Sequence, residues 1–125
     1  MPSRILIANE LSKIFKVLAH QDRIRIIEAI GAGEIDVNTL ATDLDLPTAR
    51  MSQHLSLLRA HRIVEERRDG RHRLYHLVQP ELATWIVDGL DFIEGRMSTI
   101  DPVKIRAARR LWSTNPSVRS AKTND

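Results

Sequence analysis

The amino-acid sequence predicts a mainly α-helical fold with one small β-hairpin, and three observations support this class. Apolar residues recur at helical spacing through most of the chain. Only five of the 125 residues are aromatic, so the core must consist mainly of Leu, Ile, Val and Ala, which favours packed helices over a β-sandwich. Near residue 70, two expected strands flank the pair Asp69-Gly70, which is typical of a hairpin turn.

The first part of the chain contains three expected helices. The first covers residues 5–19, where apolar side chains follow a helical period. A second helix should run from Asp22, as its N-cap, to Ile30, and the glycines that follow would end it. Asp36 is placed to cap a short third helix that continues through Leu44.

A fourth helix follows a tight break. Asp45-Leu46-Pro47 interrupts the pattern, because proline disfavours helix at the preceding residue and tolerates the start of a new helix. The fourth helix then covers residues 48–60, and Ile63-Val64 begins the hairpin. Helices three and four form a helix-turn-helix, and the hairpin after them is a wing. An isolated hairpin is marginally stable, so we expect the wing to lean on the helices.

The last part of the chain adds two helices and a tail. Gln79-Pro80 begins a fifth helix whose apolar positions continue through Ile93. Asp101-Pro102 is a good start for a sixth helix, which should end at residue 112. Residues 113–125 have almost nothing to bury, so we expect a disordered C-terminal tail. The prediction is one winged helix-turn-helix domain, residues 1–112, that includes dimerisation helices near both of its ends.

Composition excludes several functional classes. The chain has no cysteine, which excludes disulfides, thiolate metal ligands and thiol redox sensing. It has no apolar run near the roughly 18 residues of a membrane span, and no signal-peptide pattern, so we expect a soluble, cytoplasmic protein without a membrane partner. We find no Ser/His/Asp set, paired carboxylates or phosphate loop, and therefore expect no enzyme and no cofactor.

Positive charge is unevenly distributed. The net charge is only +3, but residues 48–78 contain seven arginines against three acidic residues. Residues 102–125 carry six basic residues against one acidic residue. A basic block around a helix–hairpin unit favours contact with a polyanion such as DNA.

Four segments, in order, resemble the ArsR/SmtB type of winged helix-turn-helix repressor over about residues 8–95. They are VLAHQDRIRII at 17–27, LATDLDLP at 40–47, MSQHLSLL at 51–58 and RRDGRHRLYHL at 67–77. The resemblance implies a homodimer that binds a palindromic operator and is released by an effector. The sequence does not identify that effector, which would be a small molecule or a protein.

The metal-ligand positions of that family are changed. Metal sensors of the family often carry a cysteine-containing LCVC-like segment, which reads Ile35-Asp36-Val37-Asn38 in this chain. A second family site on the fifth helix appears here as Gln79, Glu81, Phe92 and Gly95, which leaves one potential ligand out of four. The five histidines are scattered along the chain. We therefore expect no metal site and no response to metal.

Candidate DNA-binding residues lie on the fourth helix and on the wing. Gln53 and Arg50 have side chains that can hydrogen-bond adenine and guanine edges, respectively. The helix candidates are Thr48, Arg50, Ser52, Gln53 and His54, and the wing candidates are Arg67, Arg68, Arg71 and Arg73. Alternatives remain: His54 could merely buttress the turn, and the wing arginines could only protect a hairpin edge. Thr48 could both cap the helix and donate to a phosphate. Arg71, beside Gly70 at the tip, is the strongest wing candidate.

The first and fifth helices carry more apolar side chains than a small winged domain needs. The candidate dimer-interface residues are Ile7, Leu11, Phe15, Trp85, Leu90 and Ile93. Trp85 and Phe92 could instead line an effector pocket. The favoured function is a homodimeric, sequence-specific transcriptional repressor. The alternative is a winged helix that serves as a protein-interaction module with little or no specific DNA binding.

Overall fold

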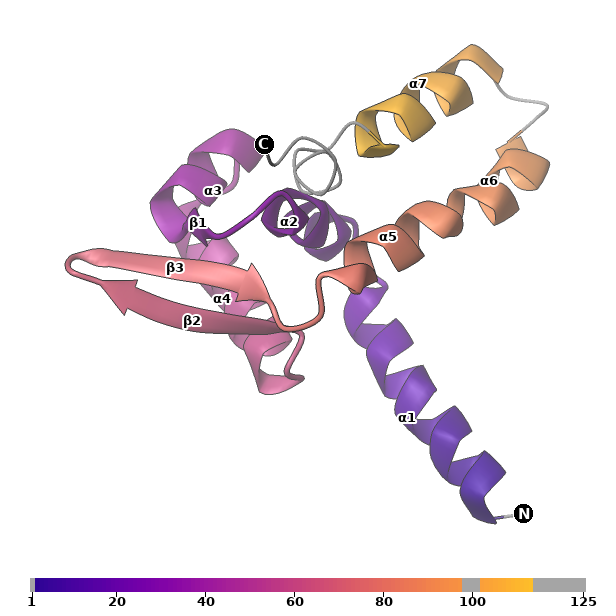
Figure 1. The fold of residues 1–125 in the computed structure, drawn as a ribbon, viewed down its shortest axis with the longest axis horizontal. Helices are drawn as coiled ribbons and strands as arrows, with labels where there is room; N and C mark the ends of the chain where they lie inside the picture. The colour runs from indigo at the N-terminus through magenta and orange to yellow at the C-terminus, as the bar shows by residue number, and fades with distance from the viewer. Residues whose placement is uncertain (1, 98–101, 114–125) are drawn as a thin grey trace, which may run out of the picture.

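The structure is a computed structural model that describes residues 2–97 and 102–113 (Figure 1). The helices and strands follow in the order α1 (Pro2–Leu18), α2 (Gln21–Gly31), β1 (Ile35–Asp36), α3 (Val37–Leu44), α4 (Thr48–Ala60), β2 (Val64–Asp69), β3 (His72–Leu77), α5 (Glu81–Asp88), α6 (Leu90–Met97) and α7 (Pro102–Ser113). The expected class, a mainly helical winged helix-turn-helix fold with a small β-element, is confirmed.

The β-element is a three-stranded antiparallel sheet with the order β1-β3-β2. In the long hairpin Asp69 pairs with His72, so the loop is Gly70-Arg71, one residue later than the expected turn pair. Gly70 has a φ of +61°, a conformation that glycine adopts without steric cost. The third strand, β1, was not predicted. Its two residues pair with Tyr75 and Leu74 of β3, and they tie the wing to the start of α3.

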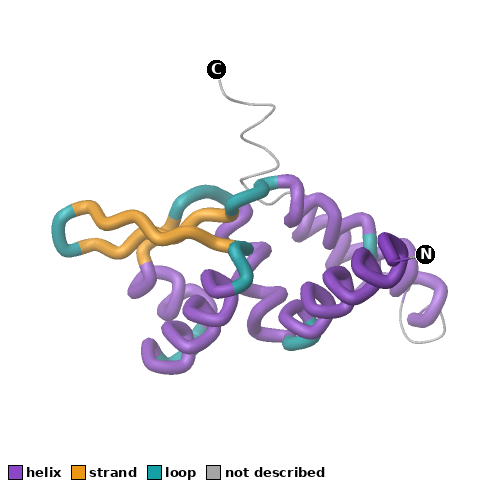
Figure 2. Tube along the Cα trace, turned by 90° about the horizontal axis from the view of Figure 1, so that it is seen from below, coloured by secondary structure: helices purple, strands orange, loops and turns teal. Residues whose placement is uncertain are grey.

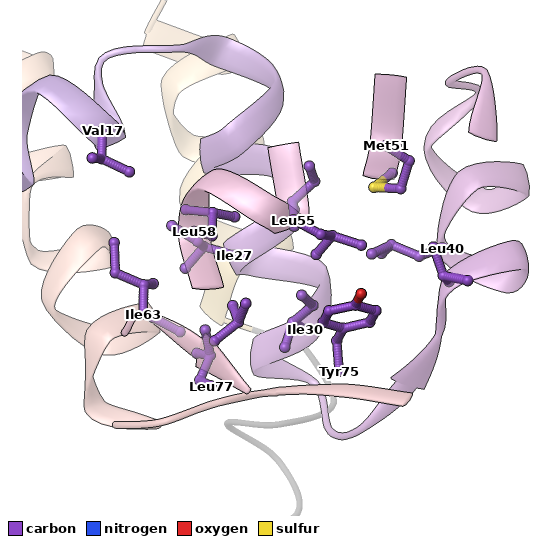
Figure 3. Packing of buried hydrophobic residues seen from close by; sticks show 14 of the residues in the cluster. Val17, Ile27, Ile30, Leu40, Met51, Leu55, Leu58, Ile63, Tyr75 and Leu77 are labelled. Carbon is purple, nitrogen blue, oxygen red and sulfur yellow. The ribbon is translucent and has the colours of Figure 1, made fainter. Parts of the chain in front are cut away.

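One apolar core joins the helices to the sheet (Figure 3). Ile27 and Leu58, from α2 and α4, are fully buried, and Tyr75 and Leu77 of β3 close the core from the sheet side. The other buried apolar residues are Val17, Leu18, Ile26, Ile30, Val37, Leu40, Ala41, Met51, Leu55, Ile63, Val64 and Ala83. Burial of aliphatic side chains stabilises such a core by about 25 cal/mol per Å², so α4 is held firmly by its apolar face.

Several helix boundaries differ from the prediction; α1, for example, covers Pro2–Leu18 where residues 5–19 were expected. His20, not Asp22, is the N-cap of α2, and its Nδ1 accepts the backbone N–H of Asp22 at 3.1 Å. The expected fifth helix is divided at Gly89 into α5 and α6. The N–H of Gly89 bonds to the carbonyl of Ile86, and that of Phe92 bonds to the carbonyl of Gly89, so the chain tightens to i→i+3 bonding there.

The helices near the two ends of the described chain extend beyond the winged core, in which Val17 and Leu18 anchor α1 and Ala83 anchors α5. In Figure 1, α1 projects away from the body, and α5 and α6 continue in another direction from the same region. Figure 2 shows the hairpin extending from the opposite end of the molecule. Of the predicted tail, Ser113 belongs to α7 and the remaining residues lie outside the described part of the chain. No helix within the described ranges is long and apolar enough to span a membrane.

Candidate nucleic-acid interface

The turn between α3 and α4 sets the orientation of α4. Asp36 caps α3, because its Oδ2 accepts the N–H groups of Asn38 and Thr39 at 3.1 and 3.2 Å. At the other end of α3, Asp45 adopts a left-handed conformation, and Leu46 donates its N–H to the carbonyl of Ala41 at 3.0 Å. The chain then re-enters helix at Thr48. The predicted helix-turn-helix is confirmed.

The outer face of α4 is polar and open to solvent. Arg50 and Gln53 are exposed, Ser52 is partly buried, and Met51 and Leu55 are buried on the opposite side. Since α4 is anchored by that buried side, its polar face is presented on a fixed scaffold. Thr48 is also exposed, but the predicted cap is wrong: Pro47 occupies the N-cap position, and α4 has no side-chain cap hydrogen bond.

The prediction that His54 contacts DNA is wrong for this conformation. Its exposed fraction is only 8%, because helical spacing turns it toward α2 and away from the face that carries Gln53. The ring lies 4.6 Å from the ring of His20, and its Nε2 lies 3.9 Å from Oδ2 of Asp22. Burial, followed by the nearby His20 and Arg23, lowers the pKa of His54. The burial of His54 is consistent with the alternative interpretation, in which it buttresses the turn.

The four wing arginines differ in exposure and in partners. Arg67, Arg68 and Arg71 are exposed and Arg73 is partly buried; Arg71 lies in the hairpin loop, and the Nε of Arg68 lies 3.5 Å from Oε1 of Glu66. Arg67 makes a two-pronged ion pair with Glu34, with its Nη2 2.6 Å from Oε1 and its Nε 3.1 Å from Oε2. The Arg67 guanidinium lowers the pKa of Glu34. Arg67 would have to exchange this carboxylate for a phosphate in order to bind DNA.

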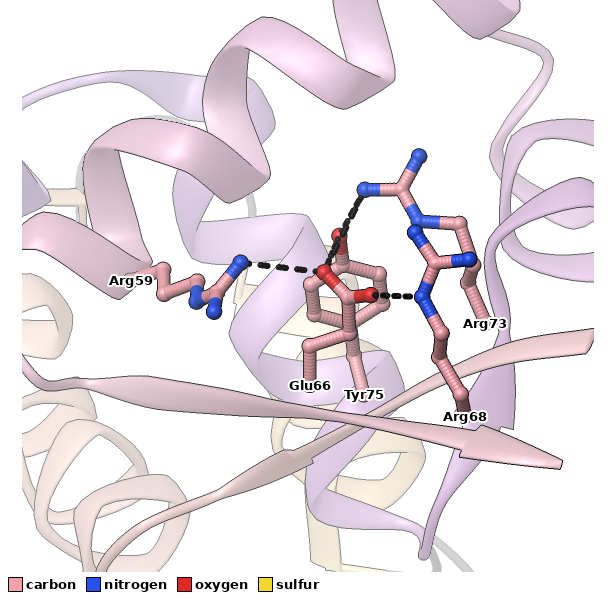
Figure 4. Close-up of polar contacts among 5 residues, drawn as sticks. All are labelled: Arg59, Glu66, Arg68, Arg73 and Tyr75. Carbon is pink, nitrogen blue, oxygen red and sulfur yellow. Dashed lines mark hydrogen bonds and ion pairs between the residues drawn. The ribbon is translucent and has the colours of Figure 1, made fainter.

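Glu66 is the centre of a polar cluster between the wing and α4 (Figure 4). Its Oε2 accepts hydrogen bonds from Arg59 of α4 at 3.1 Å, and from Arg73 and the Tyr75 hydroxyl at 3.3 Å. Arg73 also donates to the Tyr75 oxygen at 2.7 Å. The hydrogen bond from Arg73 is the main cause that lowers the pKa of Glu66. Arg73 is thus a bridge within the wing, which differs from its predicted place in the DNA contact.

Sequence reasoning missed these positioning residues. The carboxylate of Glu66 joins β2 to both β3 and α4, and Arg68 approaches its other oxygen with Nε at 3.5 Å. The only signal in the sequence was the alternation of strand residues, which places Glu66 and Arg68 on the same face of β2. That alternation could have indicated a buried carboxylate among arginines.

Exposed apolar side chains lie on α1, α5 and α6; we call them the apolar stripe, and its members are Ile7, Leu11 and Phe15 of α1, Trp85 of α5 and Ile93 of α6. All five are exposed in the isolated protomer, from 42% for Ile93 to 59% for Ile7. Phe15 and Trp85 stack with their ring centroids 5.9 Å apart. Both rings, with Phe92, line an open pocket of 470 Å³. The sixth predicted interface residue, Leu90, begins α6, and its side chain lies outside the described set.

The family's metal positions hold no suitable ligand set. Asp36 uses one carboxylate oxygen for the cap of α3, and Asn38 donates its backbone N–H to that oxygen. Phe92 is 81% exposed and offers no donor atom, and neither does Gly95. The histidines are less scattered than expected, however, because His20 and His54 lie side by side with Asp22.

The chain is similar in sequence to known transcriptional regulators. No protein-family model matches the chain. It is 33% identical over 79 residues to the biofilm growth-associated repressor of Agrobacterium fabrum, covering 63% of this chain and 68% of that protein. It is 32% identical over 80 residues to the arsenical resistance operon repressor of Escherichia coli, with the same two coverages of 63% and 68%.

Two further matches follow. One is to a curated regulator of which the chain covers a smaller share, and the other is to a solved structure. The match to the regulator KmtR of Mycobacterium tuberculosis is 32% identical over 78 residues, covering 62% of this chain but only 60% of that protein's length. The crystal structure of Rv0081 from the same organism superposes with a TM-score of 0.64 at 31% identity, covering 79% of this chain and 96% of that one. The superposition shows that Rv0081 shares the fold of this chain. The chain belongs to the ArsR family of winged helix-turn-helix transcriptional regulators.

Proposed function

We propose that this protein is a sequence-specific DNA-binding repressor that acts as a homodimer on a palindromic operator. The α4 helix would enter the major groove, and the wing would reach the adjoining backbone or minor groove. With two-fold symmetry, the two half-sites would lie about one helical turn apart, roughly 34–36 Å. Repressors among the relatives of this chain support the direction of regulation.

The observation that carries the DNA-binding proposal is the combination of two exposed surfaces. Arg50 and Gln53 stand on the solvent face of α4, which is anchored from behind by the core. Arg68 and Arg71 stand on the hairpin, and the Glu66 cluster ties that hairpin to α4. The α4 side chains can read base edges, while the wing cations can meet phosphates. Neither surface alone offers both base reading and phosphate contact.

The apolar stripe supports the dimer. Five large apolar side chains are exposed to solvent, and exposed apolar surface that gathers in a patch often marks an interface. A second copy of the chain would cover the stripe with the same stripe, which is how a two-fold interface is built. The pocket at Phe15, Trp85 and Phe92 opens on this surface, so the dimer would also close it.

The proposal includes neither catalysis nor release of the operator by metal. The family's cysteine-bearing position has no thiolate here, and its fifth-helix position retains Glu81 as a potential ligand among Gln79, Phe92 and Gly95. An effector of another kind, acting through different affinities for two states of the dimer, is compatible with the proposal.

Selection of bound fragments from a genomic library, followed by footprinting, tests the proposal. We expect enriched fragments that share one palindrome, with protection on two half-sites spaced by one turn. Binding that is equally weak for all fragments would instead favour the protein-interaction module. Protection of a single half-site by a stable monomer would overturn the palindrome and leave DNA binding intact.

A further inference from the structure

Three side chains capable of binding metal converge where the start of α2 meets α4. His20 is the N-cap of α2, Asp22 lies in its first turn, and His54 comes from the middle of α4. One ring nitrogen of each histidine and one carboxylate oxygen of Asp22 all lie within 4.8 Å of one another. The three residues belong to two elements that are far apart in sequence, so the tertiary fold creates the cluster.

A second observation points to a missing partner. The side chain of His54 is more than nine-tenths buried, and its Nε2 has no hydrogen-bond partner. Asp22 Oδ2, at 3.9 Å, is too far away for a hydrogen bond. A buried polar atom without a partner costs roughly as much as a lost hydrogen bond. A group placed between Nε2 and Asp22 would remove that cost.

The contacts that Asp22 and His20 already make limit which of their atoms an ion could use. Asp22 uses Oδ1 for Arg25 at 3.3 Å, so Oδ2 remains available on the side of His54. His20 accepts the N–H of Asp22 at Nδ1, so Nε2 is the nitrogen that could bind an ion without opening the cap of α2. His20 is exposed, which provides a route from solvent to the buried His54.

We propose that His20, Asp22 and His54 form a binding site for one divalent transition-metal ion that fastens α4 to the start of α2. Two imidazoles and one carboxylate suit Zn²⁺, Co²⁺ or Ni²⁺, whereas Mg²⁺ prefers oxygen ligands. Three protein ligands leave the fourth tetrahedral position to water. Ligand atoms around such an ion stand about 3.4 Å apart for metal–ligand distances near 2.1 Å. Small side-chain rotations would close the cluster to that size.

The expected role of the ion is structural. It would join parts of the protomer that are already adjacent, so it would hold α4 in its present position. This site differs in position and in ligands from the third- and fifth-helix positions compared above. It is independent of the proposed function, because the free protein can be tested without DNA.

The test is a metal titration of the full-length protein without DNA. We expect one Zn²⁺ per chain by calorimetry at micromolar metal, and a Co²⁺ adduct whose visible d–d bands have the intensity of four-coordinate cobalt. Saturating Zn²⁺ should raise the melting temperature by about 5 °C or more. Mg²⁺ should produce no such shift.

Matched variants locate the site. His20→Asn keeps an N-cap acceptor for α2 while removing an imidazole, and Asp22→Asn removes the carboxylate charge. Both should remain folded by circular dichroism and lose the Zn²⁺-dependent stabilisation. His61→Ala, which removes an exposed histidine at the end of α4, should keep it. No binding by the wild type, or equal loss in His61→Ala, would overturn the proposal and leave water as the partner of His54.

Discussion

Arg71 and Gln53 are both exposed and polar, yet they should contribute to DNA binding in different ways. Arg71 lies in the hairpin loop with no ion-pair partner among the described residues, so its charge is available to phosphate. Gln53 has no net charge, and its amide can pair with the edge of a base. The two residues therefore separate non-specific affinity from sequence reading.

Arg71→Ala should weaken binding to operator and to random DNA alike. Loss of one phosphate contact should reduce the slope of log K against log salt by about 0.9 for each lost contact. The measurement is a salt titration of binding by fluorescence anisotropy, with Arg96→Ala on the exposed face of α6 as the control. An unchanged slope would remove the wing tip from the interface.

Gln53→Ala should act on the operator only. If the amide reads a base edge, the loss should be about 1–3 kcal/mol on the operator and small on random DNA. Ser56→Ala, at another exposed position of α4, serves as the control. Equal losses on both DNAs would assign Gln53 to the backbone.

His54 shows what residue type alone cannot tell. The sequence placed it among polar residues on a helix expected to bind DNA, and only the direction of its side chain decides its role. That direction depends on how α4 is rotated about its axis, which is set by Met51, Leu55 and Leu58 in the core. The same rotation places the ring of His54 beside that of His20. These two residues are too far apart in the sequence for a local pattern to predict the contact.

Among the elements, those with a strong local signal could be predicted. The cap at Asp36, the break at Pro47 and the helix that follows were all readable from short-range chemistry. Strand β1 was not, because two residues carry no periodicity, and its existence depends on Tyr75 and Leu74 arriving beside it. The division at Gly89 was hidden because the apolar spacing continues across it.

The wing and α4 form a joint unit through Glu66, and Glu66→Gln should loosen it. Loss of the charged acceptor of three donors should lower the free energy of unfolding by about 1–3 kcal/mol at pH 7. Chemical denaturation measures this, with Glu65→Gln, the exposed neighbour on β2, as the control.

The Glu66→Gln variant should also change how the free energy of unfolding depends on pH in the acidic range. Because the pKa of Glu66 is lower in the folded protein than its ordinary value of 4.5, its contribution is present above pH 4.5 and is lost as the pH falls through the folded pKa. The stability difference between wild type and Glu66→Gln should therefore shrink in that acidic range. A difference independent of pH would mean that the charge of Glu66 is not what holds the wing.

At the scale of the whole molecule, assembly should depend on the apolar stripe. Leu11→Asp places a charge on a side chain that is 45% exposed in the protomer, so it should leave the protomer folded. In a dimer that charge would be buried and unpaired, which is strongly destabilising. Light scattering should show a dimer for the wild type and a 14.3 kDa chain for the variant, with loss of operator binding. Val78→Asp, another exposed apolar position, should stay dimeric.

Replacing Leu90, the first residue of α6, by Asp should also abolish both dimer formation and operator binding. A wild-type protein that is monomeric at micromolar concentration would contradict the proposed dimer. A dimeric Leu11→Asp protein would place the interface on another surface.

Metal should leave operator affinity nearly unchanged. Zinc, cobalt or nickel added to the protein–operator complex should alter the dissociation constant by less than about twofold, a coupling below roughly 0.5 kcal/mol. The reason is that a site at His20, Asp22 and His54 would join parts that are already adjacent. Tenfold release by micromolar metal would show that the ion distinguishes two states of the dimer.

The apolar stripe would also affect how the protein responds to its own abundance. If a second chain covers the stripe, as proposed, the species that recognises a two-fold site would form in proportion to the square of the chain concentration whenever chains are scarce. Occupancy of the target would then rise more steeply than that of a monomeric regulator, and a modest fall in synthesis would free the target disproportionately. The apolar stripe would thus set the steepness of a genetic dose response.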